Sequence, residues 1–289
     1  MHGDRGTDIL MITYNRPSYT SRSLPRLLDS CDEHMRVWVW HNGSDRATLD
    51  VVRSLQSHPR LHRLHHSPEN VALTQPTNWF WQHARGELVG KIDDDVLVPD
   101  NWAQILRAAH VDEPRFGAIS IWHLGQTSFD EQRAQHKIRS FRSGHRIVQN
   151  PWINGGGYLM KRRCIRHIGG LRKTEPFPHY CRRLAWLGWI NGWYYPLLHD
   201  QNMDDPRSPF TLFTSDQAFV EHAPLTARRN GITTVDGWKE LLDNNALWIQ
   251  DSPVQPGRMF PLRKPLYQFV NLLSQRAKMN TLHCETSNV

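Results

Sequence analysis

Three consecutive carboxylates, Asp93, Asp94 and Asp95, are the residues of this sequence best suited to chemistry. They follow residues 88–92, an apolar run with the length of a buried strand. Adjacent acids repel one another unless a cation neutralises them, and Mg²⁺ and Mn²⁺ prefer carboxylate oxygens and complete their shells with substrate phosphates. The pattern predicts a Mn²⁺ or Mg²⁺ site that bridges a diphosphate. A solvated acidic turn is the alternative.

Short apolar runs alternate with stretches of helical spacing in the first half of the chain. Strands are expected at 8–13, 36–41, 61–66 and 88–92, with helices after the first two and a further helix over 76–84. This alternation predicts an α/β fold with a mostly parallel central sheet flanked by helices. Ligands of such sheets bind beyond the carboxyl ends of the strands, so binding residues are expected in the loops that follow them.

Composition and charge restrict the class of protein. Hydrophobic residues make up 39% of the 289 and charged residues 22%, which is typical of a globular chain. Residues 1–8 lack the apolar stretch of a signal peptide, and the four cysteines have no paired spacing, so a reduced, cytoplasmic enzyme is expected. The net charge of +7 favours anionic partners such as nucleotides. Nucleic acid is not favoured, because no recognition motif organises the basic residues.

The sequence resembles the family 2 glycosyltransferases of the GT-A fold, whose strand-terminal Asp-X-Asp holds the metal and the nucleotide diphosphate. The resemblance implies a metal-dependent, hexosyltransferase-type transfer of a sugar from a nucleotide-diphosphate sugar, with inversion. Several short motifs in the family's order carry it: Tyr14-Asn15-Arg16, Asn42-Gly43-Ser44-Asp45, Glu69-Asn70, Asn78, Gly86-Glu87 and Asp93-Asp94-Asp95.

The resemblance implies positions around the donor for the residues that match. Asn42 would stand where the family often has an Asp that contacts the base, and Lys91 would counter phosphate charge. Asp93 would face ribose or metal, Asp94 would join the donor-binding and catalytic residues, and Asp95 would be the principal metal ligand. The remaining matches would border the base and phosphates or line the donor pocket: Thr13, Asn15, Arg16, Asn70 and Asn78. Each taken alone also fits turn or cap chemistry.

An inverting transfer needs a general base for the acceptor hydroxyl. The family usually supplies it from a Glu-Asp pair ahead of an Arg-Leu helix, and residues 175–188 match that helix without the pair. Glu175 is the nearest carboxylate and His179 the alternative. His199 resembles a His that some members bring onto the metal, and a structural His is the equal alternative. Other acids could substitute as base or ligand: Asp200, Asp204 and Asp205.

On the resemblance, residues 1–121 form a nucleotide-sugar-binding half. Residues 122–260 form an acceptor-binding half, with a flexible insertion near 122–150 and an acceptor-side loop at the glycines 155–157. Residues 261–289 form a helical tail that docks on the core or makes a peripheral membrane contact. Donor sugar and acceptor are not determined.

Two other classes of protein remain open. A nucleotidyltransferase acting on a sugar phosphate also uses a parallel sheet, acids and a metal, but the loop after the first strand, Tyr14-Asn15-Arg16-Pro17, lacks the glycines that such enzymes carry there. A non-catalytic sugar-nucleotide or polyanion-binding module is the second.

Overall fold

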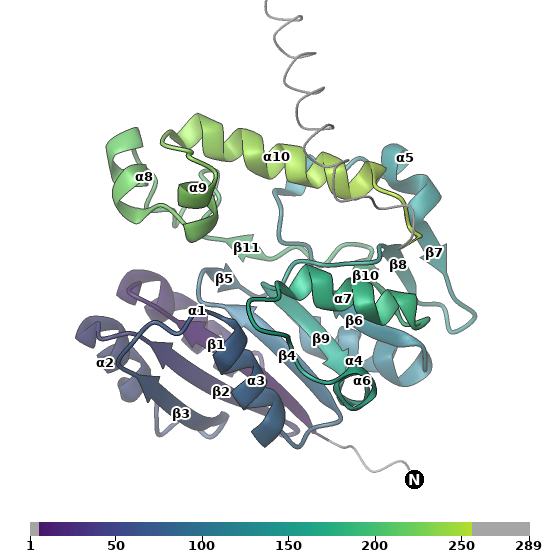
Figure 1. Ribbon diagram of the computed structural model, residues 1–289, viewed down its shortest axis with the longest axis horizontal. Helices are drawn as coiled ribbons and strands as arrows, with labels where there is room; N and C mark the ends of the chain where they lie inside the picture. The colour runs from purple at the N-terminus through teal and green to yellow at the C-terminus, as the bar shows by residue number, and fades with distance from the viewer. Residues whose placement is uncertain (1–5, 256–289) are drawn as a thin grey trace, which may run out of the picture.

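The structure is a computed structural model, and it describes residues 6–255 (Figure 1). Its centre is a sheet of nine strands in the order β3-β2-β1-β4-β9-β6-β10-β8-β7. Seven of the nine run in one direction, because only β9 and β8 pair antiparallel with both of their neighbours. The strands are β1 (Thr7–Thr13), β2 (Met35–Asn42), β3 (Leu61–Ser67), β4 (Leu88–Asp93), β6 (Phe116–Ser120), β7 (Ile138–Ser140), β8 (Arg146–Gln149), β9 (Gly157–Lys161) and β10 (Ile190–Tyr195).

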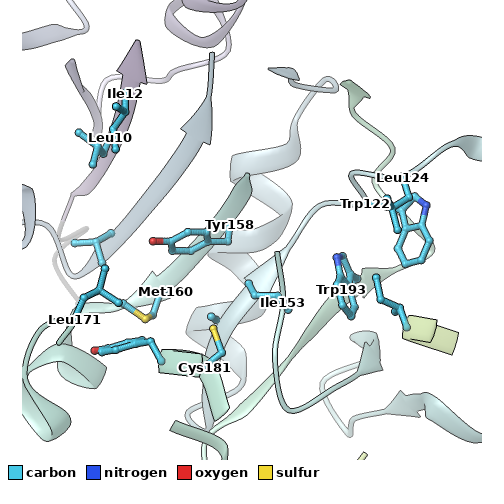
Figure 2. Packing of buried hydrophobic residues seen from close by; sticks show 14 of the residues in the cluster. Leu10, Ile12, Trp122, Leu124, Ile153, Tyr158, Met160, Leu171, Cys181 and Trp193 are labelled. Atoms are coloured by element: carbon cyan, nitrogen blue, oxygen red, sulfur yellow. The ribbon is translucent and has the colours of Figure 1, made fainter. Parts of the chain in front are cut away.

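Helices cover both faces of the sheet (Figure 1). Successive strand side chains point to opposite faces. Ile9 and Met11 of β1 therefore lie in a core with α1, α2 and α4, whereas Leu10 and Ile12 lie in a second core with α3, α6 and α7. Figure 2 shows Leu10 in this second core with Met160 and Cys181. The helices are α1 (Pro17–Asp29), α2 (Arg46–Ser54), α3 (Thr74–His83), α4 (Trp102–Asp112), α6 (Arg162–Ile168) and α7 (Phe177–Trp186).

A short second sheet lies beside the end of β4. Its two strands, β5 (Val96–Leu97) and β11 (Gln201–Asn202), pair antiparallel and bring residues more than a hundred positions apart next to each other. The chain then continues into α8 (Asp216–His222), α9 (Leu225–Arg229) and α10 (Val235–Asp251), which pack on the second core. The β5–β11 pair positions the candidate site.

The expected strands of the first half are confirmed, with ends that differ by one residue at most. Residues 122–150, expected to be a flexible insertion, contain η1 (Gln126–Ser128), α5 (Glu131–Ala134), η2 (Gln135–Lys137), β7 and β8. These elements carry few buried apolar residues, Ile147 and Val148 in β8 among them, so no periodicity marked them in the sequence.

Residues 261–289, the expected helical tail, lie outside the described residues, and so does the membrane contact predicted for it. Over residues 6–255, no helix has the length and apolar character needed to cross a membrane.

Candidate active site

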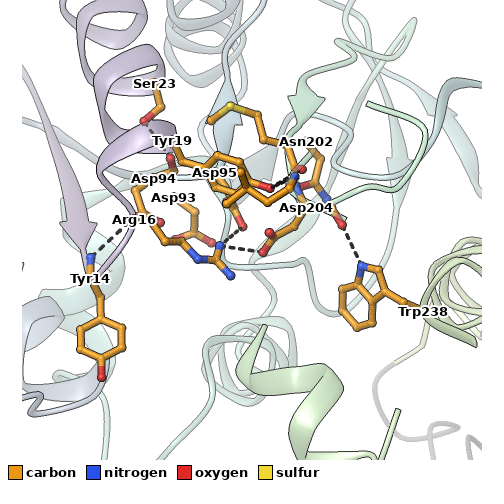
Figure 3. Close-up of polar contacts among 12 residues, drawn as sticks. Tyr14, Arg16, Tyr19, Ser23, Asp93, Asp94, Asp95, Asn202, Asp204 and Trp238 are labelled. Atoms are coloured by element: carbon orange, nitrogen blue, oxygen red, sulfur yellow. Dashed lines mark hydrogen bonds and ion pairs between the residues drawn. The ribbon is translucent and has the colours of Figure 1, made fainter. Parts of the chain in front are cut away.

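The three consecutive acids lie at the carboxyl end of β4, where the loop after β1 meets them (Figure 3). β1 and β4 pair in register, so Ile12 stands beside Asp93. The backbone N–H of Tyr14 donates to Asp94 Oδ2 at 3.2 Å, and Ser23 Oγ of α1 donates to the Asp94 carbonyl at 2.8 Å. The β1–α1 connection therefore holds the acids in place.

A fourth acid, Asp204, joins this run from a distant part of the sequence (Figure 3). The Met203 N–H donates to the Asp95 carbonyl at 2.7 Å, which sets Asp204 beside Asp95. Arg16 Nη1 lies between them, 2.7 Å from Asp204 Oδ2 and 3.5 Å from Asp95 Oδ2. We call Arg16, Asp93, Asp94, Asp95 and Asp204 the acidic cluster.

Burial and mutual repulsion perturb the carboxyls of the acidic cluster. Burial, opposed by Arg16 and reinforced by the neighbouring acids, raises the pKa of Asp94 to about 7. Burial and the charge of Asp95 hold the pKa of Asp204 well above its usual range. Burial opposes ionisation of Asp95 too, but His123 and Arg16 outweigh it and lower that pKa. One arginine therefore does not neutralise the cluster, and these acids must share protons or bind a further cation.

Two carboxylate oxygens of the cluster accept no hydrogen bond from an N–H or O–H of the described residues. Asp95 Oδ1 and Asp204 Oδ1 are buried, and the two side chains can bond each other only through a shared proton. Because an unsatisfied buried oxygen is costly, each such atom needs an explanation, and a ligand is one.

Lys91 and the glycine loop close the other side of Asp93. Lys91 Nζ contacts Asp93 Oδ1 and donates to the Gly155 carbonyl at 3.1 Å. Asp93 N donates to the Gly156 carbonyl at 2.9 Å, and a side-chain carbon on Gly156 would stand 3.0 Å from Asp93 Oδ2. The loop has glycine here because its backbone lies directly against the acid.

His123 is a site residue that the sequence reasoning missed. Its Nδ1 lies 3.0 Å from Asp200 Oδ2, and its ring stands 3.5 Å from where a side chain on Gly156 would begin, against the same glycine as Asp93. Burial alone would lower the pKa of His123, but Asp200, Asp95 and Asp93 raise it to about 10. In the sequence, the feature that could have identified His123 as a site residue is its position shortly after the end of a strand, β6.

His199, the expected third metal ligand, has a different environment. Burial lowers its pKa, and its Nδ1 has no hydrogen-bond partner among residues 6–255. It lines a cavity of about 940 Å³ together with Arg22 of α1 and Gly125. Of the two histidines it is His123 whose pKa responds to Asp93 and Asp95, so the metal role of His199 stays a prediction.

The residues expected around the base lie at the carboxyl ends of β1 and β2 and in the turn after β3. Asn42 Nδ2 donates to Asn70 Oδ1 at 2.9 Å and to the Ala72 carbonyl at 3.1 Å, and its Oδ1 accepts from Val71 N at 2.9 Å. Thr13 is buried, and its Oγ1 lies 3.1 Å from a ring nitrogen of His41. The structure thus gathers Thr13, Asn42 and Asn70 at one edge of the sheet, next to the exposed Asn15.

Asn78 and Glu175 form hydrogen bonds with neighbouring segments of the chain. Asn78 Nδ2 donates to the Leu171 carbonyl, and its Oδ1 accepts from Leu171 N, both at 2.9 Å. Glu175 Oε2 accepts from Arg183 Nη1 at 2.8 Å and from Arg172 N at 3.0 Å. We call these two contacts, Asn78 with Leu171 and Glu175 with Arg183, the helix clasps. The roles predicted for Asn78 at the donor and for Glu175 as base, with exposed His179 as the alternative, stay predictions.

Comparison with known proteins identifies the class. The profile of the family described as "Glycosyl transferase family 2" matches residues 8–169, which is more than half of the chain and includes the end of β4. The chain belongs to this family. Comparison with curated protein sequences gives no significant match.

Solved structures with the same fold are GT-A glycosyltransferases. The mannosyltransferase PcManGT from Pyrobaculum calidifontis, in complex with GDP-Man and Mn²⁺, is 18% identical, with a TM-score of 0.55 over 94% of this chain and 79% of that one. S. aureus TarS 1-349 in complex with UDP-GlcNAc is 16% identical, with a TM-score of 0.50 over 86% of this chain and 73% of that one.

GalNAc-T7 with UDP, GalNAc and Mn²⁺ is 12% identical, with a TM-score of 0.53 over 67% of this chain. This chain spans only 43% of it. These likenesses concern the fold, and the expected α/β architecture of the GT-A type is confirmed.

Proposed function

We propose that this chain transfers a hexosyl group from a nucleoside-diphosphate sugar to an acceptor hydroxyl, with inversion, and that Mn²⁺ or Mg²⁺ assists at the acidic cluster. The observation that carries the proposal is the pair of buried carboxylate oxygens, Asp95 Oδ1 and Asp204 Oδ1, that no N–H or O–H of residues 6–255 reaches, beside an Asp run in the family's position. Two of the similar structures contain Mn²⁺ with GDP-Man or with UDP and GalNAc.

The donor set of the cluster suits a hard divalent cation, which prefers carboxylate oxygens. In the part of the chain that the structure describes, no three His, Cys or acidic side chains are arranged to hold an ion as they stand. Lys91 contacts Asp93 and Arg16 contacts Asp204, so a bound metal would compete with these two side chains for the carboxylate oxygens. We assign Asp95 and Asp93 as the metal ligands, with Asp204 beside them. When bound, the metal offsets the charge of the departing diphosphate.

The chain's own residues would bind and orient the donor. Arg16 and Lys91 supply positive charge for the phosphates on either side of the Asp run, and the turn held by Asn42 and Asn70 forms a wall for the base. A side-chain carbon at Gly155 would stand 3.5 Å from Phe177 Cβ, so the glycine loop and the start of α7 border the acceptor side. For the acceptor proton, Glu175, His179 and Asp94 remain the proposed groups.

Thermal unfolding with nucleotides tests the proposal directly. We would measure the melting temperature with UDP, GDP, UDP-GlcNAc and GDP-Man, with and without Mn²⁺, for the wild type and for Asp95→Asn. A ligand at about 100 times its Kd stabilises the native state by about 2.7 kcal/mol. The expected result is a Mn²⁺-dependent shift with one nucleotide that Asp95→Asn abolishes.

Asp100→Asn is the matched control, because this acid lies five residues after Asp95 but is 84% exposed and, among the described residues, forms an ion pair with Arg26 alone. It should keep the full shift. A wild type that no nucleotide stabilises, with or without Mn²⁺, would overturn the proposal.

A non-catalytic sugar-nucleotide-binding module is the second candidate, favoured by the engagement of Glu175 with Arg183. Such a module would show the same nucleotide-dependent shift. It would release no free sugar or diphosphate from the donor over a long incubation, which separates it from an enzyme.

A further inference from the structure

A basic surface with an exposed tryptophan lies on the helices α6 and α7, away from the acidic cluster. Arg163, Arg166 and His167 are exposed on one side of α6, spaced three and four residues apart. At the end of α7, Trp186 is 65% exposed and Leu187 53% exposed. Together with Arg172 and Lys173, both exposed in the loop between the helices, these residues form what we call the α6–α7 face.

Charge is concentrated in this part of the chain. Residues 161–189 contain eight Lys and Arg and a single acid, Glu175. That acid is paired with Arg183 and is only 9% exposed, so it contributes little negative charge to the surface. The excess of basic residues in this segment alone is as large as the formal charge of +7 of the whole chain.

Contacts between α6 and the residues just after α7 make the α6–α7 face one continuous surface. The Arg163 guanidinium lies over the Trp189 ring at 4.7 Å from its centroid, and Trp189 Nε1 donates to His167 Nδ1 at 3.1 Å. Arg115, from the loop before β6, donates to the Gly188 carbonyl at 3.1 Å. The end of α7 that carries Trp186 therefore lies against the basic side of α6, and both helices lie on the same face of the sheet (Figure 1).

We propose that the α6–α7 face docks on the surface of an anionic phospholipid membrane. Basic side chains near such a surface are attracted to its negative potential, and tryptophan is enriched where an apolar ring and a polar N–H meet the headgroups. The α6–α7 face has both features side by side. Adjacent exposed apolar side chains rimmed by charge are typical of interaction sites.

The neighbouring side chains favour lipid over a nucleic acid. Leu187 lies next to Trp186 and is an aliphatic side chain that offers neither stacking nor a hydrogen bond to a base. The boundary between headgroups and acyl chains of a membrane would cover Trp186 and Leu187, whereas the phosphate backbone of a nucleic acid would contact only the arginines. The chemistry of this face therefore matches anionic headgroups above an apolar layer.

Docking there would also set the distance of the candidate site from the membrane. The first residue of α7, Phe177, lies beside Gly155 of the glycine loop, and the last, Trp186, belongs to the α6–α7 face. A helix of 10 residues spans about 15 Å. The acceptor side would lie about one helix length from the headgroups.

Sedimentation with vesicles tests the proposal on the full chain. Vesicles of phosphatidylcholine alone and vesicles mixed with phosphatidylglycerol would be spun with the wild type at low and high salt. Two variants remove the face: Trp186→Ser with Leu187→Ser, and Arg163→Gln with Arg166→Gln. All four residues are exposed, so both variants should keep the wild-type melting temperature.

Matched controls change the same residue types elsewhere. Val220→Ser with Leu225→Ser removes side chains that are 54% and 58% exposed on α8 and α9. Arg46→Gln with Arg53→Gln removes two exposed arginines of α2, which packs on the opposite face of the sheet.

The expected result is binding to the phosphatidylglycerol vesicles alone, weakened by salt. Each basic residue removed should lower the partition coefficient about fivefold, so the α6 double variant should bind about 25-fold more weakly. The Trp186 and Leu187 variant should also bind weakly, and the controls should bind like the wild type. Absence of binding would overturn the proposal. Equal binding by all variants would also overturn it, because the contact would then lie elsewhere in the chain. Binding to heparin without binding to either vesicle would overturn it as well, in favour of a polyanion other than a membrane.

Discussion

The acidic cluster and the helix clasps use buried polar groups in opposite ways. In the clasps, Asn78 and Glu175 meet backbone groups or an arginine at 2.8 to 3.0 Å, so their contacts are satisfied within the fold. In the cluster, Asp95 and Asp204 keep buried oxygens that no donor of the described residues reaches, and the pKa values of the two acids move in opposite directions. Satisfied groups hold the chain together, whereas unsatisfied ones of this kind indicate where a ligand would bind.

Arg16→Met should break the acidic cluster most severely. Its loss leaves Asp95 and Asp204 buried without their cation, which typically costs about 3–5 kcal/mol. Denaturant unfolding would measure the change in unfolding free energy, and Mn²⁺ should restore part of it because the cation replaces the lost charge.

Arg53→Met is the control for this prediction. Arg53 pairs with Asp50 at 3.7 Å, and both side chains are exposed, 57% and 71%, so the loss should stay below about 1 kcal/mol. Equal losses in the two variants would contradict the distinction between cluster and ordinary ion pairs.

Asn78→Ala and Asn42→Ala should separate a structural amide from one at the donor. Each removes amide hydrogen bonds to backbone groups, and each should cost about 1–3 kcal/mol. Only Asn42→Ala should weaken nucleotide binding as well, because the turn after β3 depends on it. Isothermal titration with the stabilising nucleotide measures the Kd of each variant. Weaker binding by Asn78→Ala would support the predicted position of Asn78 in the donor pocket.

Glu175→Gln should behave as a clasp variant if the contact with Arg183 is its main role. The amide keeps a hydrogen bond but loses the charge, so we expect a stability loss of about 1 kcal/mol and a less than roughly tenfold fall in kcat. Steady-state kinetics with an accepted acceptor gives the answer. A fall of about 10²–10⁴ in kcat with unchanged melting temperature would instead identify Glu175 as the general base.

His110→Gln tests how an unpartnered buried nitrogen outside the acidic cluster affects stability. His110 Nδ1 is buried and has no hydrogen-bond partner among residues 6–255, and burial lowers the pKa of this histidine to about 3. The unfolded chain binds this proton near pH 6.5 and the folded chain does not, so acid from pH 6.5 towards 3 should destabilise the protein.

The glutamine cannot titrate and can still donate to the Leu159 carbonyl. The loss of stability with acid, measured by denaturant unfolding, should therefore be smaller in the variant by at most about 1.4 kcal/mol per pH unit. Identical pH profiles for the two proteins would show that the pKa of His110 is the same in the folded and unfolded chains.

Local pattern determined the strands of the first half and the position of the Asp run. The apolar runs of β1, β2 and β4 are clear because these strands are buried on both faces, so each is a short hydrophobic run in the sequence. The position of the Asp run could be predicted because it needed only the end of one such strand, β4, to be placed correctly. Residues 122–150 could not be assigned in this way, since their short elements have little apolar surface to bury.

Tertiary structure alone decided which side chains surround the acids. Asp204 reaches Arg16 only because β11 pairs with β5, and His123 reaches Gly156 only because β9 lies between β4 and β6. It also decided that Glu175 meets Arg183. The sequence determines its own local periodicity and the chemistry of each side chain. The contacts between side chains that are distant in the sequence depend on how the strands pair in the whole sheet. No local pattern encodes that pairing, so only the tertiary structure shows which side chains meet.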